Sequence, residues 1–158
     1  MSVSSTIQYA KKPLPPNSKR GIRLLTIHRG ESQHFPFDIN CSLTACDLDS
    51  KPQYEALSFT WGPENHVAAI KVDGEVLEVR HNLLFALRRL RYPNCPRVMW
   101  IDAVCIDQSN LDERSSTVSY MSDIYSCATG GVIAWLGQES LDTYIVNTFI
   151  EQFINGFE

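Results

Sequence analysis

The sequence predicts an α/β fold in which helices flank a mostly parallel β-sheet. Three observations support this prediction. Buried apolar runs alternate with helical patterns after residue 54, which is typical of βαβ units with right-handed crossovers. The run 98–106 is apolar on both faces, as expected of a strand buried inside a parallel sheet. Asp73-Gly74 separates two short apolar stretches and predicts an inserted β-hairpin at one edge of the sheet.

Length, composition and charge narrow the class of protein. A chain of 158 residues, 44% hydrophobic and 20% charged, is expected to form one globular domain. The net charge of −4 and the absence of a long basic run argue against nucleic-acid binding. No apolar run approaches the roughly 20 residues of a membrane span, and the first residues lack the apolar core of a signal peptide. Five widely spaced cysteines favour reduced thiols, buried at Cys105 and Cys127, and a cytoplasmic location.

The N-terminal part of the chain is the least regular. Residues 1–20 are polar and rich in proline, so we expect a loose lead-in, followed by one domain over 21–158. Strands are predicted at 22–27 and 37–43. The clearest strand is 54–62, where small polar and large apolar side chains alternate until Gly62-Pro63.

The second half supplies the helices and the remaining strands. The hairpin comprises 69–72 and 76–79, and Asn82 is the expected N-cap of a helix that ends before Pro93. After the central strand 98–106, the patterns predict a helix over 112–128, a strand over 132–136 and a helix over 141–154. A complete doubly wound sheet usually has more strands, which suggests the N-terminal part of a longer protein.

Polar residues gather where the central strand is expected to end. Asp102 lies inside the apolar run, and a buried carboxylate there is either structural, capping a helix or pairing with Arg114, or part of a ligand site. Glu113 and Arg114 are either solvated charges at a helix start or groups that reach into the same cleft. Trp61, at the end of the neighbouring strand, would suit an aromatic ring, and an Arg would suit a phosphate.

Other kinds of site find little support. The sequence has no glycine-rich phosphate loop, no zinc-protease motif, no Cys-x-x-Cys and no nucleophile elbow, and its four histidines stand apart. We therefore expect no metal site. Cys105 could be a nucleophile only with a histidine such as His81 nearby, and its apolar neighbours favour an inert thiol.

Six blocks of the sequence closely resemble the fungal heterokaryon incompatibility (HET) domain, in the same order and spacing over residues 54–137. They are Tyr54-Glu-Ala-Leu-Ser-Phe-Thr-Trp-Gly62, Asn82-Leu-Leu-Phe-Ala-Leu-Arg-Arg-Leu90, Trp100-Ile-Asp-Ala-Val-Cys-Ile-Asp-Gln108, Glu113-Arg114, Met121-Ser-Asp-Ile-Tyr-Ser-Cys-Ala128 and Val132-Ile-Ala-Trp-Leu-Gly137. The chain departs from the family at Asp107, where Asn is usual, and at Thr117, where Gln is usual. Both departures are expected near the cleft, where either could weaken an activity.

The resemblance implies a role in fungal non-self recognition, with the domain as the effector of programmed cell death. It also implies remote similarity to Toll/interleukin-1 receptor (TIR) domains, some of which hydrolyse NAD, and hence a TIR-like or flavodoxin-like strand order. The TIR catalytic glutamate follows the third strand, where this chain offers only Glu139 and Glu151 outside any TIR motif.

Three hypotheses follow. In the first, the domain is an NAD glycohydrolase without a cofactor, and NAD is its substrate. Glu113 or Asp102 would act on the ribose, since a carboxylate there suits an oxocarbenium-like transition state. The ligand would be bound by Trp61, Ser58, Asp107, Gln108 and Arg114. In the second, it is a non-catalytic module that self-associates or recruits a partner incompatibility protein. In the third, it is an inactive or truncated member.

Overall fold

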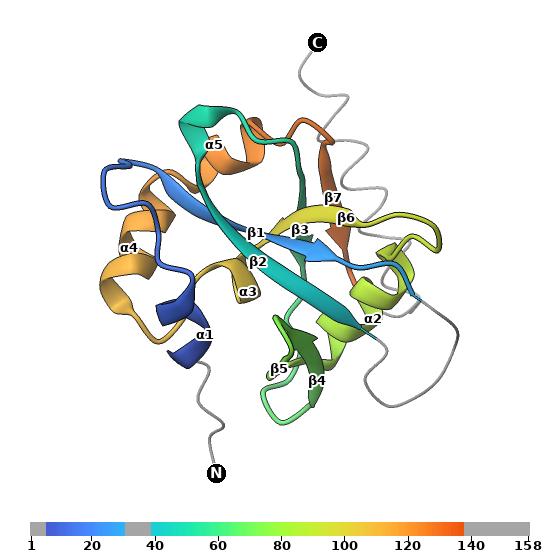
Figure 1. Ribbon diagram of the computed structural model, residues 1–158. Helices are drawn as coiled ribbons and strands as arrows, with labels where there is room; N and C mark the ends of the chain where they lie inside the picture. Colours follow the sequence, from blue (N-terminus) through green and yellow to red (C-terminus); the bar gives the residue numbers. More distant parts are fainter. Residues whose placement is uncertain (1–5, 31–38, 138–158) are drawn as a thin grey trace, which may run out of the picture.

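The computed structural model describes residues 6–30 and 39–137, which form a mixed sheet with helices around it (Figure 1). The sheet has seven strands in the order β5-β4-β2-β1-β6-β3-β7. The strands are β1 (Gly21–Ile27), β2 (Asn40–Asp47), β3 (Glu55–Phe59), β4 (Val67–Val72), β5 (Glu75–Arg80), β6 (Arg97–Ile101) and β7 (Val132–Trp135). The helices are α1 (Thr6–Lys11), the 3-10 turn η1 (Leu48–Ser50), α2 (His81–Leu90), α3 (Asp102–Cys105), α4 (Leu111–Ser119) and α5 (Met121–Ser126).

One side of the sheet is parallel and confirms the predicted α/β class. β3 pairs in parallel with β6 and with β7. If these three strands are numbered in chain order, with β3 first, β6 second and β7 third, they lie in the sheet in the order 2-1-3. That is the order in which a flavodoxin-like sheet begins. The crossovers place α2 on one side of the sheet and α4 and α5 on the other (Figure 1). The carboxyl ends of β3 and β6 therefore lie side by side.

The prediction of a mostly parallel sheet is wrong for the whole molecule. β1 runs antiparallel to both of its neighbours, β2 and β6, and only three of the six strand pairings are parallel. β1 is almost completely buried, as a strand of a parallel sheet would be. An apolar run reports burial on two faces, but it carries no information about the direction of the neighbouring strands.

The inserted hairpin is confirmed at the edge of the sheet. β4 and β5 pair antiparallel on either side of Asp73 and Gly74, which have φ values of 51° and 82°. A two-residue turn of type I′ requires positive φ at both central positions, and the Asp-Gly pair tolerates it. The hairpin joins the rest of the sheet through a short parallel pairing between β4 and β2.

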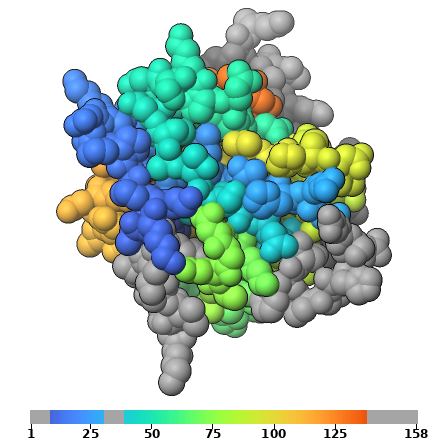
Figure 2. All heavy atoms as spheres, in the orientation of Figure 1, coloured from blue at the N-terminus to red at the C-terminus, as the bar shows by residue number. Residues whose placement is uncertain are grey.

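The chain before β1 differs from the predicted loose lead-in. Residues 6–11 form α1, and the Tyr9 ring is buried against the core with 6% of its surface exposed. The Lys11 ammonium forms an ion pair with Glu75 of β5, which ties α1 to the hairpin. Figure 2 shows these N-terminal residues, in blue, packed between the green hairpin and the orange α4. No helix in the described residues is long and apolar enough to cross a bilayer.

Three predicted elements have different bounds from those expected. The strand predicted over 98–106 ends at Ile101, and the chain then forms the helical turn α3. The helix predicted over 112–128 is divided at Tyr120 into α4 and α5. The N-cap of α2 is Arg80, whereas Asn82 lies in the first turn and donates a 2.9 Å hydrogen bond to the Thr60 carbonyl. The helix predicted over 141–154 lies outside the described residues.

Candidate functional site

A cavity of about 410 Å³ lies beside the carboxyl ends of β3 and β6. Its walls come from α1, the loop after β3, strands β4 and β5, α3 and the loop before α4. The lining residues are Tyr9, Trp61, Glu64, Val67, Leu77, Glu78, Val79, Arg80, Ala103, Gln108 and Ser109. The volume is within the range of small-molecule pockets, and the charged and polar side chains in the lining make this cavity more polar than most of them.

Trp61 and Asp102 lie close together because they follow the adjacent strands β3 and β6. Trp61 lines the cavity and stacks on Phe59, with ring centroids 6.1 Å apart and an interplanar angle of 11°. The Trp61 indole lies close enough to the Asp102 carboxylate to lower its pKa. The backbone N–H of Ala103 donates a hydrogen bond to this carboxylate, at 2.7 Å. Asp102 is not among the described residues that line the cavity, but it lies beside two that do, Trp61 and Ala103.

Burial raises the pKa of Asp102 above its ordinary value, although the hydrogen bond from Ala103 and the nearby Trp61 indole act in the opposite direction. Asp102 is expected inside a strand, but it is half-buried and lies directly after β6, at the start of α3. A half-buried carboxyl with a raised pKa at the end of a strand is a common feature of functional sites.

Tyr125 lies close to both Asp102 and Ser58 and extends this polar cluster. Burial is the main cause of the raised pKa of Tyr125, the negative charge of Asp102 raises it further, and the nearby Ser58 side chain lowers it. The Tyr125 ring packs edge-on against Trp100 at 5.5 Å. Ser58 lies within the cluster but is not among the described residues that line the cavity.

Gln108 lines the cavity, whereas Asp107 supports the loop beneath it. The Gln108 side-chain amide donates a 2.9 Å hydrogen bond to the Asp102 carbonyl. Asp107 is buried and accepts hydrogen bonds from the Ser109 hydroxyl at 2.6 Å and from the Ser109 backbone N–H at 3.1 Å. The Asp107 carboxylate is thus turned toward its own loop.

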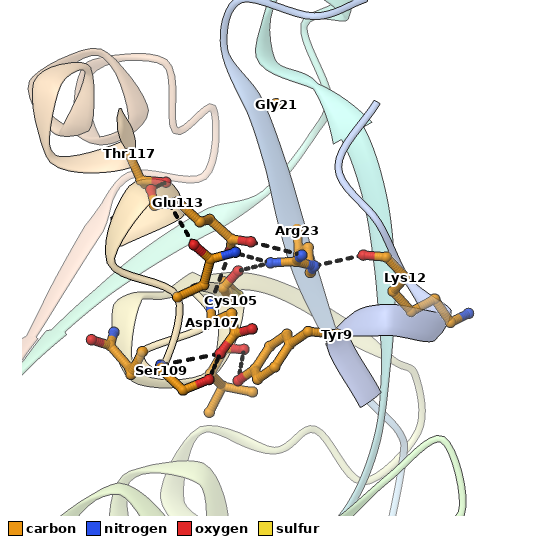
Figure 3. Close-up of polar contacts among 12 residues, drawn as sticks. Tyr9, Lys12, Gly21, Arg23, Cys105, Asp107, Ser109, Glu113 and Thr117 are labelled. Atoms are coloured by element: carbon orange, nitrogen blue, oxygen red, sulfur yellow. Dashed lines mark hydrogen bonds and ion pairs between the residues drawn. The ribbon is translucent and has the colours of Figure 1, made fainter. Parts of the chain in front are cut away.

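Glu113 lies in a buried ion pair rather than in the cavity wall (Figure 3). Both of its carboxylate oxygens accept hydrogen bonds from the guanidinium of Arg23, and one of them also accepts the Asp107 backbone N–H at 2.8 Å. The Glu113 and Arg23 side chains are 11% and 3% exposed. Glu113 follows the N-cap Asn110, whose side chain accepts a bond from the Glu113 N–H.

Arg114 is exposed on α4 and is not among the described residues that line the cavity. The cavity contains a different guanidinium, Arg80, at the end of β5. One nitrogen of Arg80, Nη1, is buried and has no hydrogen-bond partner in the described structure. Another, Nη2, lies 3.6 Å from the carboxylate of the exposed Glu64. No sequence pattern distinguishes Arg80, because the fold of the hairpin brings it to the site.

The cysteines are free thiols, as expected, and none forms a disulfide. Cys105 is buried, and burial raises its pKa to about 12, which leaves it unreactive at neutral pH. The expected burial of Cys127 is wrong, because this residue is exposed just after α5. Within the described residues, no three histidine, cysteine, aspartate or glutamate side chains form a group that could hold a metal.

Comparison with known proteins identifies the family of this chain. The model of the heterokaryon incompatibility protein (HET) family matches residues 54–153, which is more than half of the sequence. The chain belongs to the HET family. It is 34% identical to "Heterokaryon incompatibility protein 6, OR allele" of Neurospora crassa, and the alignment covers 73% of this chain. The alignment covers 18% of that relative, so the chain corresponds to a small part of its length. No solved structure matches the chain significantly.

The two positions expected to differ from the HET family, Asp107 and Thr117, both lie around Glu113. Asp107 donates its backbone N–H to the Glu113 carboxylate, and the buried Thr117 donates its hydroxyl to the Glu113 carbonyl at 2.9 Å. Neither side chain lines the cavity. In this HET domain Asp107 and Thr117 therefore contact Glu113, which lies behind the cavity wall, and not the cavity itself.

Proposed function

We propose that this HET domain is the effector part of a fungal non-self recognition protein and that its activation triggers programmed cell death. Membership of the HET family supports the role, as does similarity to a protein named for heterokaryon incompatibility. The domain would act in the cytoplasm, where the reducing environment suits its five free cysteines.

At the molecular level, the proposed activity is hydrolysis of NAD in the cavity beside β3 and β6. The observation that carries this proposal is the half-buried Asp102 carboxylate, which lies beside the lining residues Trp61 and Ala103 of a cavity that also contains Arg80. Trp61 would stack on a ring of the nucleotide, and Arg80 would bind its phosphates. Glu64 and Glu78 at the cavity wall suit the positive charge of the nicotinamide ring.

The proposed reaction breaks the bond between nicotinamide and ribose. Nicotinamide leaves with the bonding electron pair, and the positive charge that develops on the ribose is stabilised by the ionised Asp102. A water oxygen then bonds to the anomeric carbon, and its proton passes to the Asp102 carboxylate. The products are ADP-ribose and nicotinamide, with one proton released when Asp102 ionises again.

Asp102 suits this role better than Glu113, the other carboxylate expected from the sequence. Both Glu113 oxygens are occupied by Arg23, and removing this side chain from its pair would leave a buried charge. Asp102 is half-buried, lies beside Trp61 and precedes Ala103 in the cavity wall.

The test is to incubate the purified protein with NAD at low and high protein concentration and to follow free nicotinamide by chromatography. Asp102→Asn is expected to lower the rate by roughly 100-fold or more, the scale of a lost catalytic carboxylate. Asp112→Asn, which removes an exposed carboxylate from the first turn of α4, is the matched control and is expected to retain the rate. Nicotinamide release that survives in Asp102→Asn would contradict the assignment of Asp102. If the wild type neither binds NAD nor releases nicotinamide at any protein concentration, the proposed activity is rejected.

A second candidate function is self-association through α4, with or without chemistry. Leu111 and Val118 are 70% and 57% exposed, and a spacing of seven residues places them on the same face of the helix. The double variant Leu111→Glu/Val118→Glu should then remain monomeric at concentrations where the wild type assembles, as measured by light scattering. If nicotinamide release appears only at high concentration and is lost in this variant, assembly is the switch for catalysis.

A further inference from the structure

Arg23 is a buried cation in the middle of the sheet, and it contacts three separate segments of the chain (Figure 3). Its Nε donates a 2.7 Å hydrogen bond to the Lys12 carbonyl just after α1. Its Nη1 donates to the Cys105 carbonyl at the end of α3 and to Glu113, and its Nη2 donates to Glu113 at 3.1 Å. A planar guanidinium can satisfy all of these acceptors at once, which a lysine could not.

The partner of Arg23 holds the loop that forms one wall of the cavity. Glu113 accepts the backbone N–H of Asp107 at 2.8 Å, and Asp107 in turn accepts the hydroxyl and the N–H of Ser109. Gln108 and Ser109 of this loop line the cavity. The carboxylate of Glu113 is therefore bonded directly to the loop whose next two residues line the cavity.

Helix α1 is attached to the same cluster. The Tyr9 ring lies beneath the Arg23 guanidinium, 5.0 Å from ring centroid to Cζ, and the Tyr9 hydroxyl donates a 2.9 Å hydrogen bond to the Val104 carbonyl of α3. Tyr9 also lines the cavity. Both Tyr9 and Arg23 precede residue 54, where the match to the HET family begins.

We propose that Arg23 and Glu113 are a positioning pair that fixes the loop Asp107–Ser109 at the cavity and joins helix α1 to it. Glu113 then acts on the ligand only through the loop. The identity of the ligand rests on the function proposed above, whereas the hold on the loop does not. The N-terminal segment thereby becomes part of the site, although the family match does not include it.

Two double variants separate the hold on the loop from the charge of the pair. Arg23→Met/Glu113→Leu removes both charges and also the acceptor for the Asp107 N–H. Arg23→Met/Glu113→Gln removes both charges but keeps a carbonyl oxygen at the acceptor position. Replacing both partners of a buried ion pair leaves no unpaired charge, so both variants are expected to fold. If the first does not fold, Glu113→Asp provides the comparison, since its shorter side chain keeps the charge and withdraws the acceptor.

The first measurement is amide hydrogen exchange at Asp107, followed by NMR, which needs no ligand. Exchange at Asp107 is expected to be about tenfold faster in the Leu variant and close to wild type in the Gln variant, because a single hydrogen bond distinguishes them. The amide of Ile70, which is in strand β4 and outside the cavity lining, is the internal control. Equal exchange in the two variants would overturn the proposal.

The second measurement is the dissociation constant for NAD, obtained by titration. It is expected to be about tenfold weaker in the Leu variant and restored in the Gln variant. A loosened loop with unchanged NAD binding would overturn the part of the proposal that concerns the cavity. If the wild type does not bind NAD, the proposed function fails, and the exchange measurement still decides whether the pair positions the loop.

Discussion

At position 113 a single carboxylate satisfies a buried guanidinium and a loop amide, so its removal should be costly. Glu113→Ala would leave the Arg23 charge buried without its partner, and we expect a loss of about 3–5 kcal/mol in the free energy of unfolding. Urea denaturation measures this loss. The neighbouring Arg114→Ala removes an exposed side chain and is expected to change stability by less than about 0.5 kcal/mol. A small effect at Glu113 would mean that the pair does not persist in solution.

Asp102 should destabilise the fold at neutral pH. Burial raises its pKa in the folded protein above the value in the unfolded chain, so its contribution to stability is fully present below the unfolded pKa and is lost as the pH rises through the folded pKa. Asp102→Asn cannot ionise. The stability of this variant relative to wild type is therefore expected to increase between about pH 4 and pH 7, the interval above the ordinary aspartate pKa. Unfolding free energies across that interval provide the check, and a decreasing difference would contradict the raised pKa.

At the scale of elements, two glycines with similar backbone conformation should respond differently to alanine. Gly74 in the hairpin turn has a φ of 82° and open space around it, so Gly74→Ala should cost about 1 kcal/mol from the left-handed backbone alone. Gly62 has a φ of 76°, and an added Cβ would lie 2.8 Å from the Asn82 amide that binds the end of β3. Gly62→Ala should therefore cost more than Gly74→Ala. Thermal unfolding of the two variants compares them, and equal losses would indicate that Asn82 moves away freely.

The elements that the sequence predicted well are those fixed by local chemistry. The Asp73-Gly74 turn requires positive φ, and these residue types supply it, so the hairpin could be placed before its partners were known. The bounds after Ile101 could not be placed in this way. An apolar stretch such as 101–106 suits a buried strand or a buried helical turn equally well, and tertiary contacts decide between them.

The candidate site shows the same division. Trp61, Asp102 and Gln108 could be predicted to lie together because they follow two adjacent strands. Arg80 and Tyr9 reach the cavity through the packing of the hairpin and of α1, and the pairing of Arg23 with Glu113 joins residues 90 positions apart. No periodicity or motif encodes such long-range contacts.

For the whole molecule, the sheet should not open as one unit. β1 and β2 pair along the full length of β1, whereas in the described part of the chain the ladder between β4 and β2 has only the pairs Asn40–Lys71 and Cys41–Val72. We expect amides in the β4–β5 hairpin to exchange through local opening, with a lower free energy than amides in β1, which should require global unfolding. Hydrogen exchange at increasing denaturant concentration distinguishes the two regimes. Identical opening free energies for the hairpin and β1 would contradict this expectation.

The position of β1 and β2 in the middle of the sheet has a practical consequence for dissecting this domain. A recombinant fragment cut to the family match, residues 54–153, would begin after both strands. It would keep β5-β4 and β6-β3-β7 but lose the two strands that join them, leaving two exposed backbone edges prone to aggregation. A fragment of this HET domain made for experiments should therefore begin upstream of Thr6, since a fragment defined by sequence similarity alone would omit the centre of its own sheet.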